Sequence, residues 1–102
     1  MEEIKRKVVW WDIEAKKQLQ EIFRFISSDS ISAAIKIKND ILSLVHKLPE
    51  QPEVYPPDKF KSNNDGNYRA FEKHRYRIAY KITEKNILIL RLCHTSREPL
   101  LY

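Results

Sequence analysis

Residues 76–82 read YRIAYKI, residues 86–94 read NILILRLCH, and these two stretches decide the fold. In the first, apolar side chains alternate with Arg77 and Lys81, which is typical of a strand with one face on the core. We expect that face to carry Tyr76, Ile78, Tyr80 and Ile82. The second stretch is apolar on both faces, as a central strand would be. Because only a short loop, Thr83–Asn86, separates the two stretches, we expect an antiparallel hairpin.

Two helices and a further strand are predicted upstream of this hairpin. Ile4–Trp11 has the pattern of a short strand, and Asp12 is a suitable N-cap for the helix that follows. Apolar positions recur at helical spacing on both sides of a break at Ser27–Ser30, and the second helix should run over Ile31–Leu48, where Pro49 ends it. The apolar stripes are Ala15, Leu19, Ile22, Phe23 and Ile26 in the first helix, and Ala34, Ile37, Ile41, Leu44, Val45 and Leu48 in the second. Two amphipathic helices with so short a link predict a helical hairpin.

The remaining segments complete a single α+β domain over residues 1–102. The proline-containing residues 49–60 predict an extended loop, and Asp65-Gly66 marks a turn before another strand pattern at Tyr68–His74. The predicted order is β-α-α-β-β-β, with the helix hairpin packed on one face of a small, mainly antiparallel sheet. Arg77 and its basic neighbours are left on the opposite face.

The composition fits a soluble globular protein and excludes several classes. The chain has 102 residues, of which 42% are hydrophobic and 32% charged. No apolar run approaches the roughly 18 residues that a membrane span needs, and the N-terminal residues have no signal-peptide pattern. Cys93 is the single cysteine, so we expect no disulfide and no cysteine-based metal site. We therefore expect a cytoplasmic protein without a cofactor, a metal ion or a membrane contact.

The charge is unevenly distributed along the chain. Residues 1–58 hold nine Lys or Arg and ten Asp or Glu, a net charge of −1. Residues 59–97 hold ten Lys or Arg and three acidic residues, a net charge of +7. Such asymmetry points to nucleic acid or an acidic protein as a partner. A solvated basic face that keeps the protein soluble is the alternative explanation.

The strand pattern and the residues after it resemble a known superfamily. The stretch YRIAY at 76–80, the stretch ILILRLCHTSRE at 87–98 and the element order are similar to the RelE/ParE superfamily, the toxins of bacterial type II toxin–antitoxin modules. The resemblance implies two possible activities. RelE-like members cut mRNA in the ribosomal A site without a metal, whereas ParE-like members share the fold but inhibit DNA gyrase and are not nucleases. The leucine-rich last strand that ends in His94 is also similar to ParE-type sequences.

Four residues are candidates for metal-free RNA cleavage, in which the 2′-hydroxyl attacks the phosphorus. By resemblance to RelE-like members, Arg77 matches a phosphate-binding arginine, Arg97 a second arginine beyond the last strand, and Tyr102 a tyrosine near the C-terminus. Arginine stays protonated in proteins, so both arginines would stabilise charge on the phosphate. His94 is the best candidate for acid–base work, since the unperturbed pKa of histidine is about 6.5. Tyr102 is a second candidate for that work, or a platform for base stacking.

Arg69, Lys73 and Arg91 are the candidates for substrate binding. Arg69 and Lys73 correspond to basic residues of the preceding strand in RelE-like members, and Arg91 adds a cation from the last strand. Phe71 stands where RelE itself has a second lysine, so the cationic set is incomplete. An inactive relic that only binds an antitoxin is therefore a further alternative.

Each catalytic candidate also has a structural explanation. Arg77 could pair with Glu72 across the sheet, because cross-strand ion pairs are common. Strand parity places His94 with Leu88, Leu90 and Leu92, opposite Arg91, and this is the core side if the strand is unbroken. Tyr102 could fray with the end of the chain.

We therefore expect a toxin that arrests growth by cleaving ribosome-bound mRNA, with ParE-like inhibition of DNA gyrase as the alternative. Either activity implies a cognate antitoxin. An acidic segment of that partner would match the basic residues 59–97 electrostatically.

Overall fold

The computed structural model describes residues 6–102. Its elements are β1 (Val8–Trp11), α1 (Ile13–Ser27), α2 (Ile31–Lys47), β2 (Tyr68–Lys73), β3 (Tyr76–Ile82) and β4 (Asn86–His94). The predicted order β-α-α-β-β-β and the α+β class are confirmed. The predicted first strand began at Ile4; Ile4 and Lys5 lie outside the described residues, and the strand itself begins at Val8. The second helix ends at Lys47, one residue before the predicted end, and Leu48 is its C-cap.

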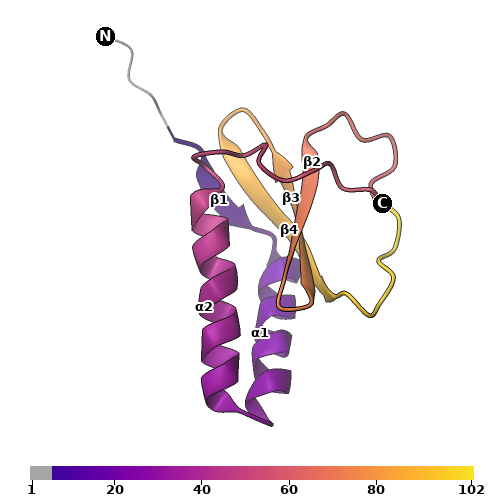
Figure 1. The fold of residues 1–102 in the computed structure, drawn as a ribbon. Helices are drawn as coiled ribbons and strands as arrows, with labels where there is room; N and C mark the ends of the chain where they lie inside the picture. Colours follow the sequence, from indigo (N-terminus) through magenta and orange to yellow (C-terminus); the bar gives the residue numbers. More distant parts are fainter. Residues whose placement is uncertain (1–5) are drawn as a thin grey trace.

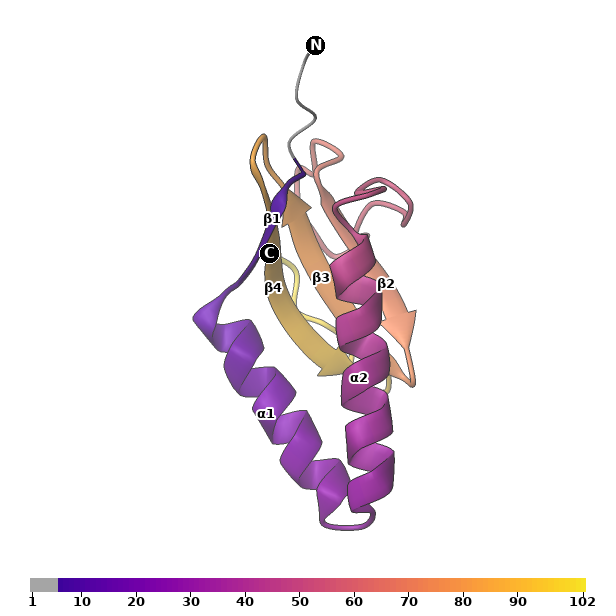
Figure 2. The same ribbon diagram turned by 90° about the vertical axis from the view of Figure 1, so that its left-hand side faces the viewer.

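The strands form one sheet in the order β1-β4-β3-β2. The pairs β2–β3 and β3–β4 are antiparallel, and β1 lies parallel to β4, with Val8 opposite Asn86 and Trp11 opposite Ile89. The α1–α2 hairpin covers one face of this sheet, and its tip extends past the end of the strands (Figures 1 and 2). The mainly antiparallel sheet with helices on one face is therefore as predicted.

Both helices begin at a capping side chain. The Asp12 carboxylate accepts a hydrogen bond from the Glu14 backbone N–H at 3.2 Å, and the Ser30 hydroxyl accepts one from the Ala33 N–H, also at 3.2 Å. Such bonds satisfy backbone donors that have no partner inside the helix. Neither helix, within the described part of the chain, is long and apolar enough to cross a membrane.

The core lies between the helix hairpin and the sheet. Tyr80 is fully buried there, its hydroxyl donates to the Pro52 carbonyl at 2.7 Å, and burial raises the pKa of this phenol to about 12. Phe71 is also buried, and its ring stacks on Tyr55 with the centroids 4.8 Å apart. Phe71 therefore occupies a core position, where a lysine would have to bury its charge.

A bulge in β4 corrects the predicted parity of that strand. Ala79 pairs with Arg91 and the next residue, Tyr80, pairs with Ile89, so Leu90 is the extra residue. The prediction that Leu88 shares a face with Leu92 was wrong, because Leu88 pairs with Lys81 on the face away from the helices. Beyond the bulge, Leu92 and His94 do lie on the helix side, opposite Arg91.

A third layer covers the opposite face of the sheet. It consists of the later part of the loop between α2 and β2, from Asp58 to Ser62, and of the C-terminal segment that follows β4 (Figure 1). Two backbone hydrogen bonds join them, from Ser62 N–H to the Tyr102 carbonyl at 2.6 Å and from Tyr102 N–H to the Phe60 carbonyl at 3.1 Å. Asp58 N–H in turn donates to the Tyr68 carbonyl on β2 at 2.8 Å. The C-terminal segment is therefore hydrogen-bonded to the loop, which is itself bonded to the sheet.

The cap of α2 gives a test of this description. We expect Ser30→Ala to lower the free energy of unfolding by about 1 kcal/mol, because the Ala33 N–H loses its acceptor. Ser43→Ala is the matched control, since Ser43 is exposed inside the same helix and alanine is the better helix former. Urea unfolding followed by circular dichroism measures both, and equal losses would contradict the capping role.

Candidate functional site

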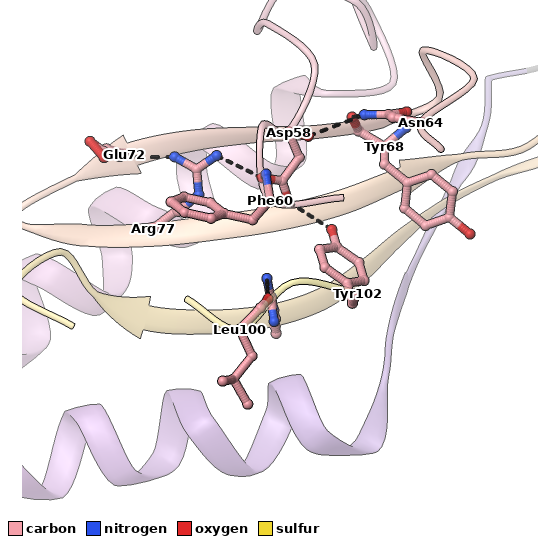
Figure 3. Close-up of polar contacts among 9 residues, drawn as sticks. Asp58, Phe60, Asn64, Tyr68, Glu72, Arg77, Leu100 and Tyr102 are labelled. Carbon is pink, nitrogen blue, oxygen red and sulfur yellow. Dashed lines mark hydrogen bonds and ion pairs between the residues drawn. The ribbon is translucent and has the colours of Figure 1, made fainter. Parts of the chain in front are cut away.

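A buried carboxylate, Asp58, organises the face of the sheet opposite the helices. Asp58 follows two prolines in the loop, and only 2% of its surface is exposed. Its Oδ1 accepts hydrogen bonds from Arg77 Nη2 at 2.8 Å and from the Phe60 N–H at 3.0 Å, and its Oδ2 accepts one from the Tyr102 hydroxyl at 2.7 Å (Figure 3). Burial alone would raise the pKa of Asp58, but these donors outweigh it and hold the pKa below its ordinary value of 3.8.

Arg77 belongs to this network and does not face open solvent. Its side chain is 14% exposed, and its guanidinium also lies 4.9 Å from the centre of the Phe60 ring. The pairing with Glu72 across the sheet is present at 3.7 Å, but Glu72 is half exposed and the shorter, buried pair is with Asp58. The charge of Arg77 is thus neutralised within the protein.

Tyr102 is fixed rather than frayed. Besides its bond to Asp58, its ring meets the Tyr68 ring edge-on with centroids 5.9 Å apart, and the Arg91 guanidinium lies 4.1 Å from its centre. Arg91 also donates to the Leu100 carbonyl at 2.7 Å. Burial and the neighbouring Asp58 both raise the pKa of the Tyr102 phenol, so it remains a hydrogen-bond donor at neutral pH.

The expected substrate-binding cations differ in how they are used. Arg69 donates to the carbonyls of Gly66 at 2.9 Å, Tyr55 at 2.8 Å and Glu53 at 3.2 Å, which fastens the loop to β2. Lys73 is exposed at the end of β2. The structure therefore brings Arg77, Arg91 and Tyr102 together around the loop and leaves Lys73 apart from them.

His94 lies on the other side of the sheet from Arg77. It pairs with Tyr76 at the end of β4, and the two rings meet edge-on with centroids 5.2 Å apart. Its Nδ1 accepts a hydrogen bond from the Ser96 N–H at 3.0 Å and lies 2.7 Å from the Ser96 hydroxyl. The histidine and the Arg77–Asp58 pair are thus separated by the sheet itself.

Arg97 and Arg77 do line one shallow cleft, of about 290 Å³, beside the end of β4. Lys59, Ser96 and Cys93 also line it. Arg97 is exposed, whereas burial raises the pKa of the Cys93 thiol and keeps it unreactive. An anion in this cleft would meet Arg97 and Lys59, but also the carboxylates of Glu72 and Glu98, which line it too. Within residues 6–102, no three His, Cys, Asp or Glu side chains are grouped as metal ligands.

Asp58 is the residue that sequence reasoning missed. Arg77 in a half-buried strand requires an acidic partner, and this requirement is visible in the sequence. The partner, however, lies 19 residues away in a loop that has no periodic pattern. The two prolines before Asp58 mark an extended segment but do not indicate which strand it crosses.

The buried pair gives a prediction about stability. Arg77→Met should lower the free energy of unfolding by about 3–5 kcal/mol, because it leaves the Asp58 carboxylate buried without its countercharge. Glu72→Gln is the matched control and should change stability by less than about 0.5 kcal/mol, since that partner is exposed to solvent. Chemical denaturation of both variants checks this, and similar losses would contradict the dominance of Asp58.

The hydrogen bond from Tyr102 should make stability depend on pH. The folded pKa of Asp58 lies below the ordinary value of 3.8, so its contribution is complete above that pH and is lost as the pH falls through the folded pKa. Tyr102→Phe should cost about 2 kcal/mol at neutral pH, and this cost should shrink below pH 3.8 as Asp58 protonates. Tyr68→Phe, on the neighbouring ring, should show no such trend. Unfolding measured from pH 7 to about pH 2 would test the difference.

Comparison with known proteins places the chain in a family. Residues 9–99 match the family model described as the ParE toxin of the type II toxin–antitoxin system parDE. None of the curated protein sequences compared with the chain is a match.

Solved structures share the fold at low identity. The chromosomal ParDE toxin–antitoxin system of P. aeruginosa superposes with a TM-score of 0.68 at 20% identity, over 87% of this chain and 96% of that one. The RelBE2 toxin–antitoxin complex of Mycobacterium tuberculosis gives 0.61 at 17% identity, over 87% and 98%. The YoeB dimer of Staphylococcus aureus gives 0.57 at 18% identity, over 87% and 95%. From the family match over residues 9–99, this chain belongs to the ParE toxin family of type II toxin–antitoxin systems, within the RelE/ParE superfamily.

Proposed function

We propose that this toxin acts in the ParE-like manner, by binding and inhibiting DNA gyrase without cutting RNA. The observation that carries the proposal is the pairing of Arg77 with the buried Asp58 at 2.8 Å. A phosphate-binding arginine must present free donors to the phosphate oxygens. Arg77 Nη2 instead donates to the carboxylate of Asp58, whose side chain has no exposed surface, so this N–H is not free for a phosphate.

The position of His94 supports the same proposal. Acid–base catalysis requires the base within hydrogen-bond reach of the reacting group. His94 is on the helix side of the sheet, against Tyr76, whereas Arg77 is on the other side. The hydroxyl of Tyr102, the second acid–base candidate, donates its hydrogen bond to Asp58, and the pKa of this phenol is raised. A binding toxin needs none of these groups to converge.

Cleavage of ribosome-bound mRNA is the second candidate function. The cleft that Arg77 and Arg97 line together favours it, because Lys59 adds a third cation there. In this case the arginines would stabilise a phosphate, with Arg97 as the exposed donor.

A cognate antitoxin is part of the proposal. The P. aeruginosa and M. tuberculosis structures that share this fold are toxin–antitoxin systems. We propose that the present toxin is likewise neutralised by a protein partner.

The two candidate functions can be separated with one preparation of the full chain. We expect inhibition of supercoiling by purified gyrase, and no new 5′ ends in mRNA when the toxin is added to a translation extract and the message is read by primer extension. Arg97→Ala, at an exposed residue, should leave gyrase inhibition within about twofold, since surface substitutions change stability little. Cleaved message together with unimpaired supercoiling would overturn the proposal in favour of the nuclease.

A further inference from the structure

The sheet has two edge strands, β1 and β2, and the two edges are treated differently. The outer edge of β2 is joined to the loop by a bridge between Pro57 and Arg69 and by a hydrogen bond from Asp58 N–H to the Tyr68 carbonyl at 2.8 Å. Among the described residues, β1 has β4 as its one neighbour in the sheet, and it forms the left-hand edge in Figure 2. The other side of β1 is therefore an open edge in residues 6–102.

The backbone groups of Val9 and Trp11 face this open edge. The N–H groups of Val8 and Asp12 donate to carbonyls on the β4 side, at 3.0 and 2.9 Å. Because the N–H and C=O groups of successive strand residues point to opposite sides, those of Val9 and Trp11 point away from β4. They are the groups to which a further strand would bond.

The side chains along this edge are apolar and exposed. Val8 is 56% exposed and Trp10 is 59% exposed, and Trp10 pairs with Leu88 on the face of the sheet away from the helices. β1 is short, but its sequence, VVWW, contains neither a proline nor a charge, and these are the residues that commonly prevent an edge strand from pairing. The edge is therefore suited to a partner strand.

The charges nearest to the two ends of β1 have opposite signs. Arg6 and Lys7 precede the strand, whereas Asp12 and Glu14 follow it, and Lys16 comes one turn further along α1. Arg6 is 74% exposed, and its carboxylate partner in the loop after α2 is 3.7 Å away and also exposed, so that ion pair is weak. Lys7 donates to two carbonyls of the β3–β4 turn, at 2.6 and 2.7 Å. A strand that carries the same charges in the reverse direction would be complementary to β1 at both ends.

We propose that β1 pairs with β1 of a second copy of this chain, antiparallel about a twofold axis, and so joins two four-stranded sheets into one of eight strands. A twofold axis makes both copies use the same surface. With the axis at Trp10, Val9 of each copy lies opposite Trp11 of the other, and the groups that face the open edge bond to each other within β1. The two Trp10 residues then lie opposite each other on the axis.

This register gives the exposed tryptophan a partner. Trp10 would lie between two hydrogen-bonded pairs, where facing Cα atoms are about 4.5 Å apart and the side chains are close. Aromatic pairs across neighbouring strands stabilise a sheet. At each end of the strand pair, Arg6 and Lys7 of one copy come near Asp12 and Glu14 of the other. One contact thus uses the open backbone groups, the exposed tryptophan and the opposite end charges.

A second copy fits this edge better than an acidic segment of another protein. A uniformly acidic strand would match Arg6 and Lys7 but would meet Asp12 and Glu14 at the other end, where like charges oppose pairing. The reversed copy places opposite charges at both ends. The inference concerns the toxin by itself and does not rest on the proposed inhibition of gyrase.

The first experiment measures the mass of the full chain against its concentration. Each copy contributes one short strand, so we expect an interface at or below about 1,200 Å² and a dimer that dissociates on dilution. In sedimentation equilibrium the mass should rise from 12.2 kDa toward twice that value between about 1 and 300 µM. A mass that stays at 12.2 kDa throughout, or that rises past the dimer, would overturn the inference.

The second experiment removes the aromatic pair. Trp10→Lys should raise the dissociation constant of the dimer at least about tenfold, because two lysines then face each other on the axis. Phe25→Lys is the matched control, since it also replaces an exposed aromatic residue by lysine but lies near the far end of α1. It should change the constant by less than about twofold. Equal effects would indicate general apolar association and would overturn the inference; circular dichroism checks that both variants are folded.

The third experiment tests the register by a disulfide cross-link. Trp10→Cys and Val8→Cys are each combined with Cys93→Ala, which removes the native thiol. In the proposed dimer the two copies of position 10 face each other within disulfide reach, whereas the two copies of position 8 are about 13 Å apart along the strands. Oxidised glutathione should therefore link the Trp10→Cys chains and not the Val8→Cys chains, although the two positions are similarly exposed. No link at position 10, or equally fast links at both positions, would overturn the inference.

Discussion

The buried carboxylate of Asp58 is the constraint on which the outer layer of the molecule depends. A carboxylate that loses its water must be supplied with donors, and an incomplete set would be strongly destabilising. One donor is local, the Phe60 backbone two residues along the loop, and two are distant in sequence, Arg77 on β3 and Tyr102 in the C-terminal segment. A single ionised group thereby specifies where the loop and the C-terminal segment lie on the sheet.

Because of this constraint, several cations in the basic residues 59–97 serve the fold and not a binding surface. The net charge of +7 on residues 59–97 suggests a binding surface there. Arg69, Arg77 and Arg91, however, bind backbone carbonyls and a carboxylate of the protein itself. Exposed cations beside apolar surface also lie on the helical side, where Lys16, Arg24 and Lys38 line a hollow with Leu19 and Phe23, in the half of the chain with a net charge of −1. Net charge by segment is a poor guide to binding wherever the cations are part of a buried network.

Most of the fold could be predicted from the sequence because it rests on local periodicity. The YRIAYKI alternation, the apolar β4 and the two helical stripes each indicate their element and its buried face. The bulge at Leu90 could not be found in this way, since an extra residue in a strand leaves no mark in an apolar run. The contacts of the site could not be predicted either, because Asp58 and Tyr102 lie outside any periodic segment and are 44 residues apart in the sequence.

The parallel pairing of β1 with β4 has a consequence for how this toxin comes into being. Val8–Trp11 can complete the sheet only after Asn86–Ile89 has been synthesised, so the four-stranded sheet cannot form on the ribosome until residues 86–89 have emerged. Contacts between such distant segments also slow folding, because the loop must close before the pairing stabilises it. A nascent chain that has not yet reached Asn86 therefore has no partner strand for Val8–Trp11.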